Sequence, residues 1–214
     1  MLSQFAQEGF GVLLEPLALE HAPALAEAAA GDRSAYGYTW VPAGLQEARA
    51  WTEGTLAARD SGRQVPFAVR DTRGGGRVVG STRFLDLDVF SWPPSWPPGA
   101  SPGPEPRDEQ PPTVAEIGST WYAARSQRTH VNTACKFLLL RHAFEEWKSA
   151  RVSLKTDARN MRSRAAIERI GARFEGVRRA HVPATDGTVR DGASFSIMAD
   201  EWPTARETLE KRLT

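Results

Sequence analysis

The segment from residue 120 to residue 176 reads TWYAARSQRTHVNTACKFLLLRHAFEEWKSARVSLKTDARNMRSRAAIERIGARFEG. Its pattern predicts a strand ending in Trp-Tyr, a polar loop at 127–132, an apolar helix, a second strand and a second helix. This order of elements is typical of a fold that holds one long phosphorylated ligand. The segment therefore predicts both a fold class and the region where a ligand binds.

The loop at 127–132 leads into the apolar helix. Backbone N–H groups in the first turn of a helix have no partner inside the helix, which favours an anionic group such as a pyrophosphate. Asn132 is expected to cap this helix. After the second strand, Asn160 and Ser163 lie one helical turn apart and present donors and acceptors on one face. We interpret this pair as contacts for an amide-bearing arm, a role compatible with N-capping by Asn160.

These residues resemble the acyl-coenzyme A-binding core of the GCN5-related N-acetyltransferase (GNAT) superfamily, and within it the RimJ/RimL-like group. The resemblance extends over roughly residues 65–199. It implies one acetyltransferase-like domain over 1–214, with an α/β (α+β) fold. Its mixed, mostly antiparallel sheet of six to seven strands would be flanked by helices. It also implies acetyl-coenzyme A as the co-substrate and direct attack by a primary amine, carried by a protein N-terminus or a small molecule.

Apolar periodicity and turn residues predict the individual elements. Hairpin turns are expected at Gly74-Gly75-Gly76 and at Asp186-Gly187. The expected strands cover 11–17, 65–71, 78–87, 114–122, 151–156, 173–182 and 189–198; the expected helices cover 19–30, 46–59, the residues from 133 onward, 162–171 and 204–213.

The usual pyrophosphate signature of the family is Gln or Arg, two residues, Gly, one residue, then Gly or Ala. Here its positions are Gln127, His130 and Asn132, so both small positions are replaced. The pattern Gln127-x-Thr129-x-x-Asn132-x-x-x-Lys136 resembles a RimJ/RimL-like variant in which polar side chains and a lysine supplement the loop. Ordinary helix capping is the alternative interpretation. The expected co-substrate contacts are Trp121, Tyr122, Gln127, Arg128, Thr129, His130, Val131, Asn132, Lys136, Asn160 and Ser163.

Glu116 is the candidate general base. In the resembling family, the strand before the phosphate loop splays away from its neighbour, and a free backbone N–H there meets the thioester carbonyl. Glu116 is the carboxylate of this strand, and alternation places it on the same face as Gly118 and Thr120. The alternative is that Glu116 pairs with an arginine or caps backbone groups. Many members carry a tyrosine acid where this chain has Ile167, so the thiol is expected to leave with help from Ser163, with help from water, or without a specific acid.

Two further segments are candidates for binding. Tyr36, Tyr38 and Trp40 lie in an aromatic loop between the first two helices, which is either a packed cover or, as the resemblance implies, a wall of the acceptor site. The Pro/Trp-rich insertion at about 89–113 carries nine of the 15 prolines. Its interpretations are a solvated excursion or, through Trp92 and Trp96, a dimer arm or substrate lid; a homodimer is therefore one expectation.

Composition bounds the remaining possibilities. Lys plus Arg number 27 and Asp plus Glu 26, so the net charge of +1 gives no general reason to expect nucleic acid or an anionic membrane as partner. The single cysteine, Cys135, excludes an internal disulfide and cysteine-based zinc patterns, and is expected in the core; no metal is expected. Without an evident signal peptide or a membrane-spanning apolar run, a cytoplasmic location is expected. Rival functions are a non-catalytic acyl-coenzyme A sensor and an interaction protein that uses the insertion.

Overall fold

The computed structural model describes residues 4–90 and 110–214, so Trp92, Trp96 and most of the Pro/Trp-rich insertion lie outside the described residues. The strands of the described residues are β1 Gln7–Gly9, β2 Val12–Pro16, β3 Val65–Asp71, β4 Arg77–Asp88, β5 Val114–Tyr122, β6 Arg151–Asp157, β7 Arg173–Pro183 and β8 Val189–Met198. The α-helices are α1 Ala22–Ala29, α2 Gly44–Asp60, α3 His130–Arg141, α4 Met161–Arg169 and α5 Trp202–Leu213, and a π-helical turn, η4 His142–Glu146, continues α3.

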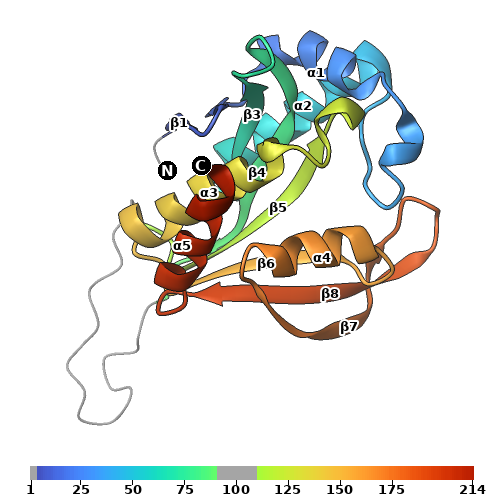
Figure 1. Ribbon diagram of the computed structural model, residues 1–214. Helices are drawn as coiled ribbons and strands as arrows, with labels where there is room; N and C mark the ends of the chain where they lie inside the picture. Colours follow the sequence, from blue (N-terminus) through green and yellow to red (C-terminus); the bar gives the residue numbers. More distant parts are fainter. Residues whose placement is uncertain (1–3, 91–109) are drawn as a thin grey trace.

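The strands form one mixed sheet in the order β1-β2-β3-β4-β5-β6-β8-β7 (Figure 1). Neighbouring strands are antiparallel except β5 and β6. These two are parallel because α3 returns the chain to the end of the sheet where β5 begins. The seven predicted strands and both predicted hairpins are confirmed, and the mostly antiparallel α/β architecture with them. The sheet has an eighth strand, β1, because a three-residue segment is too short to show a periodic pattern.

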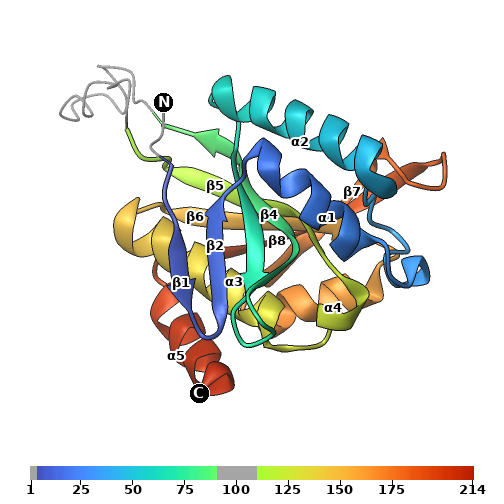
Figure 2. The same ribbon diagram turned by 90° about the horizontal axis from the view of Figure 1, so that it is seen from above.

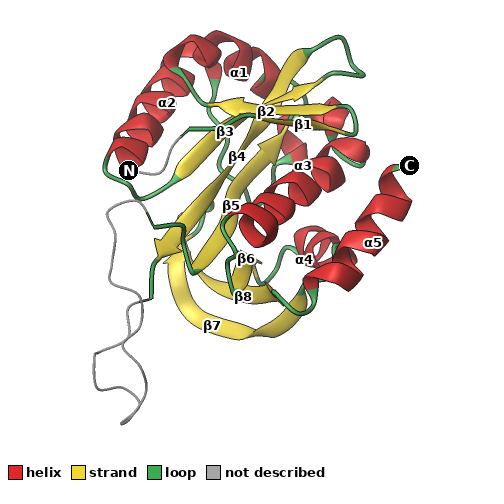
Figure 3. Ribbon diagram, turned by 90° about the vertical axis from the view of Figure 1, so that its left-hand side faces the viewer, coloured by secondary structure: helices red, strands yellow, loops and turns green. Residues whose placement is uncertain are grey.

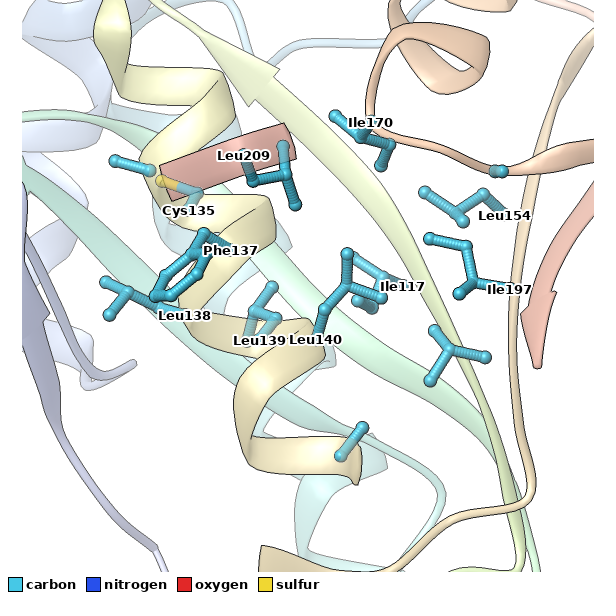
Figure 4. Close-up of a cluster of buried hydrophobic side chains, with 14 of the residues drawn as sticks. Ile117, Cys135, Phe137, Leu138, Leu139, Leu140, Leu154, Ile170, Ile197 and Leu209 are labelled. Atoms are coloured by element: carbon cyan, nitrogen blue, oxygen red, sulfur yellow. The ribbon is translucent and has the colours of Figure 1, made fainter. Parts of the chain in front are cut away.

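Helices cover both faces of the sheet. Figures 2 and 3 show α1 and α2 on one face and α3 with α5 on the other, while α4 packs beside β6 and β8. The core beneath α3 contains fully buried side chains from the helix, from β5, β6 and β8 and from α5, among them Phe137, Leu138, Leu139, Leu140, Leu154, Ile197 and Leu209 (Figure 4). Among the helices of residues 4–90 and 110–214, none combines the length and apolar content needed to cross a bilayer.

The start of α3 differs from the expectation. The helix begins at His130, and its N-cap is Thr129, whose hydroxyl oxygen accepts a hydrogen bond from Val131 N at 3.3 Å. The prediction that Asn132 is the N-cap is therefore wrong; Asn132 lies within the first turn. Thr129 caps the free N–H groups of the helix three residues earlier in the chain. The hydrophobic pattern did not reveal this earlier start, because the first turn of the helix is polar.

A β-bulge in β5 interrupts the pairing of β5 with β4. Two residues of β5, Ser119 and Thr120, oppose the single residue Thr82 of β4, and Ser119 has a φ of 45°. The extra residue reverses the alternation, so Thr120 lies on the face covered by α3 and contacts that helix. Glu116 lies between two residues that face α3 and therefore points to the other face. The expectation that Glu116 and Thr120 share a face is wrong.

At Gly80, the backbone of β4 packs closely against that of β5, and a substitution tests this packing. A Cβ built on Gly80 would lie 2.1 Å from the carbonyl oxygen of Trp121, and its φ of 158° is rarely adopted by other residues. We predict that Gly80→Ala lowers the free energy of unfolding by roughly 2–6 kcal/mol, the combined cost of overpacking and backbone strain. Urea denaturation measures it.

Gly54→Ala is the matched control, because Gly54 is exposed in α2 and a Cβ there meets nothing within 4 Å. This change should instead raise the free energy of unfolding by about 0.5–1 kcal/mol through higher helix propensity. A Gly80→Ala protein as stable as the wild type would contradict the described packing of β4 on β5.

Candidate functional site

A cavity of about 1030 Å³ opens where β5 and β6 separate. These two strands pair only through three residues of each, ending at Glu116 and Ser153, after which β6 continues beside β8. Figure 1 shows the two strands starting together and diverging. The cavity is lined by the rest of β5, by β6, by the N-terminal parts of α3 and α4, by the α1–α2 loop and by the β7–β8 hairpin.

One end of the cavity is formed by the loop before α3. Gln127, Arg128, Thr129 and Asn132 all line it, and Arg128 has a left-handed φ of 61°. The Gln127 side-chain amide donates to Tyr122 O at 3.3 Å and accepts from the Arg162 guanidinium at 3.1 Å. The unpartnered N–H groups at the start of a helix, with cationic side chains beside them, suit an anionic ligand.

The start of α4 forms the neighbouring wall. Asn160 caps this helix, since its side-chain oxygen accepts a hydrogen bond from Ser163 N at 3.0 Å, and both residues line the cavity. The capping role considered for Asn160 is therefore present. Ile167 also lines the cavity and is buried, so the position of the usual tyrosine presents an apolar surface.

Two predicted contacts do not reach the cavity with their side chains. His130 turns away from it, with Nε2 3.3 Å from Gly11 O and 3.5 Å from Asp71 Oδ1. Val131 is fully buried in the core. Both residues lie in the first turn of α3; the His130 backbone N–H belongs to the helix N-terminus, and the Val131 N–H donates to the Thr129 cap.

Cys135, in the interior of α3, is a buried and unreactive residue. Tyr122 lines the cavity, but its hydroxyl is buried next to the Cys135 thiol. Burial raises the pKa of Cys135 to about 12. A thiol with so high a pKa is not a nucleophile at neutral pH, which agrees with the interpretation of Cys135 as a core residue.

The opposite end of the cavity is aromatic. Tyr36, Tyr38 and Trp40 all line it; Tyr36 is buried, while Tyr38 and Trp40 are 40% and 50% exposed. Trp121 meets both Tyr36 and Trp51 edge to face, with ring centroids 6.4 Å apart. The predicted aromatic loop is thus both a cover over the core, through Tyr36, and a cavity wall, through Tyr38 and Trp40.

The aromatic loop is attached to the far side of the cavity. Arg159 lies over the Tyr38 ring, 5.2 Å from its centroid, and forms ion pairs with Asp157 at 2.8 Å and Asp186 at 2.9 Å. The hydroxyl of Thr185, in the β7–β8 hairpin, donates to Gly37 O at 3.3 Å. These contacts join the loop, the start of α4 and the hairpin into one rim.

Glu116 is buried on the aromatic side of the opening. Its Oε2 lies 2.6 Å from Lys155 Nζ, which also contacts Asp86 Oδ2 at 3.0 Å. Burial raises the pKa of Glu116, although Lys155 opposes the shift. The partner is therefore a lysine instead of the arginine considered from sequence. Asp86 and Lys155 were missed as site residues, although Ser153 and Lys155 are polar positions alternating with apolar ones in β6 and gave a signal.

Lys136 lies on the other face of β5. It is buried, and its amine donates to Thr120 Oγ1 at 2.9 Å; that hydroxyl is also hydrogen-bonded to Thr82 Oγ1 at 2.7 Å. Burial lowers the pKa of Lys136 to about 8. Sequence reasoning placed Lys136 at the phosphate loop, whereas the structure directs its amine to β5, where the strands diverge.

The lining therefore combines a helix N-terminus with cationic side chains at one end and an aromatic loop at the other, with a buried carboxylate between β5 and β6. Such a cavity suits an extended anionic ligand that delivers its far end to a second molecule. Within residues 4–90 and 110–214, no group of three or more His, Cys, Asp or Glu side chains is arranged to hold a metal ion.

Comparison with known proteins identifies a family with this architecture. Residues 12–173 match the family model described as an acetyltransferase (GNAT) domain. No curated protein sequence gives a significant match. A GCN5-related N-acetyltransferase from Brucella melitensis is 27% identical, with a TM-score of 0.81 over 99% of this chain and 86% of that one.

Two other solved structures are similar. A candidate acetyltransferase from T. thermophilus is 31% identical, with a TM-score of 0.77 and full coverage of both chains. RimJ from Mycobacterium smegmatis, solved in complex with CoA-disulfide, is 22% identical, with a TM-score of 0.72 over 97% of this chain and 92% of that one. At that identity, the likeness to RimJ concerns the fold.

The burial of Lys136 has a measurable consequence for stability. A lysine whose pKa falls from 10.5 to about 8 on folding opposes folding wherever it is charged. We predict that Lys136→Met raises the free energy of unfolding at pH 7 by roughly 1–3 kcal/mol, since one pKa unit corresponds to about 1.4 kcal/mol and lost hydrogen bonds offset part.

The difference in unfolding free energy between Lys136→Met and the wild type should shrink as the pH rises from about 8 towards 10.5. In that window the unfolded wild type binds more protons than the folded wild type, so the stability of the wild type rises with pH. Denaturation curves over this pH range measure both effects. A Lys136→Met protein less stable than the wild type at every pH would contradict the buried position of the amine.

Proposed function

The chain belongs to the GNAT acetyltransferase family, and we propose that it transfers an acetyl group from acetyl-coenzyme A to a primary amine by direct attack. The observation that carries this proposal is the opening between β5 and β6, which joins the N-terminal ends of α3 and α4 to an aromatic chamber. Acyl-coenzyme A-dependent transfer is the chemistry of the family; the acceptor and the residue roles are our proposal.

The pyrophosphate of the co-substrate would bind at the loop before α3. Backbone N–H groups of the first helical turn, with Gln127, Arg128, Thr129 and Asn132, supply the donors. His130 would contribute through its backbone N–H, because its side chain turns elsewhere, whereas the Val131 N–H is held by the Thr129 hydroxyl.

The amide-bearing arm of the co-substrate would then enter the opening between the strands. Asn160 and Ser163 border it from α4, and Trp121 and Tyr122 border it from β5. The β5 edge facing β6 has no strand pairing beyond Glu116 within the described residues, so backbone groups there are free to bind the arm and the thioester carbonyl.

The acceptor amine would approach from the aromatic end. Tyr38 and Trp40 present large exposed surfaces at the rim, and the Tyr36 ring closes the chamber inside. This end is open to solvent and suits either a peptide N-terminus or a small molecule with an apolar body.

Glu116 would accept the proton that the amine loses. It lies on the acceptor side of β5 and is largely removed from water, and its raised pKa makes it a better base than an exposed glutamate. Lys155 bonds to it and holds the carboxylate in place. Below the pKa of Glu116, which lies above its ordinary value of 4.5, protonation would stop this step, so turnover should fall on the acid side.

The first experiment separates binding from turnover. Acetyl-coenzyme A should raise the melting temperature, since a ligand that binds only the folded state stabilises it. Release of free thiol is then measured with a panel of peptides and small amines. Binding without turnover on any acceptor would point to an acyl-coenzyme A sensor, and no stabilisation at millimolar ligand would refute both functions.

Glu116→Gln tests the base. We predict a kcat lower by about 10²–10⁴-fold, the usual contribution of general base catalysis, with unchanged stabilisation by acetyl-coenzyme A. Glu53→Gln, on the exposed surface of α2 and outside the cavity lining, is the control and should behave as the wild type. Equal kcat for Glu116→Gln and wild type would exclude the role.

Asn160 is tested with two substitutions that separate capping from ligand binding. Serine also caps helices, so Asn160→Ser should keep most of the stability that Asn160→Ala loses, which is about 1 kcal/mol. If the Asn160 amide contacts the co-substrate, both variants should weaken coenzyme A binding by a similar factor. Isothermal calorimetry measures this, and tight binding by Asn160→Ser would reduce the residue to a cap.

A further inference from the structure

Two buried ionisable groups flank the opening between β5 and β6 from opposite faces of the sheet. Glu116 lies on the acceptor side, beside the chamber lined by Tyr38 and Trp40. Lys136 lies on the α3 side, where the loop before α3 and the start of α4 form the co-substrate end. The bulge at Ser119 turns Thr120 to the α3 side, opposite Glu116, where its hydroxyl accepts a hydrogen bond from the Lys136 amine.

The two groups are placed for opposite halves of an acyl transfer. An amine that arrives from the aromatic end loses its proton on that side. The sulfur of a thioester whose body lies along α3 and α4 leaves on the other side. We propose that Lys136, hydrogen-bonded to Thr120, is the catalytic acid that protonates the departing coenzyme A thiolate. This inference rests on the proposed acetyl transfer.

The other nearby groups are unsuited to this step. Ile167, at the position of the usual tyrosine, has no proton to give. Burial raises the pKa of Tyr122 well above 10 and that of Cys135 to about 12, so neither donates readily. Ser163 lines the cavity, but an alcohol is a weaker acid than an ammonium group. Lys136 has three N–H donors, of which Thr120 receives one.

The environment of Lys136 keeps its proton exchangeable. The titratable groups that act on it are Cys135 on the same helix and Glu116 on β5, both of which favour the charged form, while burial dominates and lowers its pKa to about 8. The cavity walls from β6 and α4 present the apolar side chains of Leu154, Ile167 and Ile170. The charged groups of these two walls are Lys155, Arg162 and Arg169. An acid with a pKa near the working pH is effective in proton transfer.

The step balances as follows. The neutral amine nitrogen bonds to the thioester carbonyl carbon, and the carbon–sulfur bond breaks with its electron pair on sulfur. The Lys136 ammonium gives a proton to that sulfur, and the new amide nitrogen gives a proton to Glu116. The products are the acetylated amine and coenzyme A thiol; Glu116 then releases its proton to solvent and the Lys136 amine regains one.

Lys136→Met and Lys136→Arg test the inference by kcat against pH, with KM for acetyl-coenzyme A and calorimetric coenzyme A binding measured in parallel. In the wild type, kcat should fall above about pH 8, where Lys136 loses its proton. Lys136→Met should lower kcat by about 10²-fold and abolish this alkaline limb, with KM and binding changed by less than about threefold.

Arginine separates proton donation from simple attraction. The guanidinium keeps a positive charge but does not release its proton, so Lys136→Arg should stay as slow as Lys136→Met. Recovery of kcat in Lys136→Arg would show that the charge alone matters and would overturn the inference. The inference would also be overturned if Lys136→Met kept the wild-type kcat and its fall at alkaline pH. The same holds if Ser163→Ala, and not Lys136→Met, lost both.

A measurement without turnover completes the test. NMR titration of ¹³C-labelled lysine, with the Lys136 signal assigned from its absence in Lys136→Met, should give a midpoint near pH 8 in the ligand-free protein. A midpoint above pH 10 would overturn the inference. Absence of thiol release by the wild type with every amine would instead refute the proposed acetyl transfer, which separates the two failures.

Discussion

The early end of the pairing between β5 and β6 is the constraint on which the rest of the structure depends. These parallel strands share only three residue pairs, because β6 then follows β8 while β5 follows β4. The apolar helix α3 connects them and fills the space beneath, with Leu138, Leu139 and Leu140 fully buried. The sheet is thereby held together at one end and open at the other, and the N-terminal turns of α3 and α4 meet at the open end.

The bulge at Ser119 adds chemistry to this opening. Without the extra residue, Thr120 would share a face with Glu116, and the hydroxyl that bonds the Lys136 amine would lie on the acceptor side. The bulge lets Thr120 bond the buried Lys136 amine on one face of β5 while Glu116 lies on the other face. Burying a charge is unfavourable unless it is paired. Glu116 has the cationic partner Lys155, whereas the partner of Lys136 is the neutral hydroxyl of Thr120, so the burial of the ammonium opposes folding. Groups with perturbed pKa values in a cavity are typical of functional sites.

Much of the fold was predictable because its signals are local. The glycines at 74–76 and the Asp-Gly pair at 186 indicated hairpins, and alternating or helical periodicity indicated the α-helices and seven of the eight strands in the described part of the chain. Resemblance to the GNAT family identified the loop before α3 and the Asn160 region as cavity walls. The prediction erred where neighbours in space decide: the cap of α3 is Thr129, the His130 side chain turns to Gly11, and Glu116 pairs with Lys155.

The sequence by itself determined the order of elements, the turns and the family to which the chain belongs. It also showed that isoleucine, at position 167, replaces the usual tyrosine. All of these depend on residue types at short spacing. Only the tertiary structure decided which face each polar side chain of β5 takes. A bulge depends on the register between two strands, and the contact of Thr82 with Thr120 joins residues 38 positions apart. The same register gave the Lys136 amine its partner Thr120 at the opening, away from the phosphate loop where the sequence predicted it, since a helical periodicity indicates the buried face but not the partner found there.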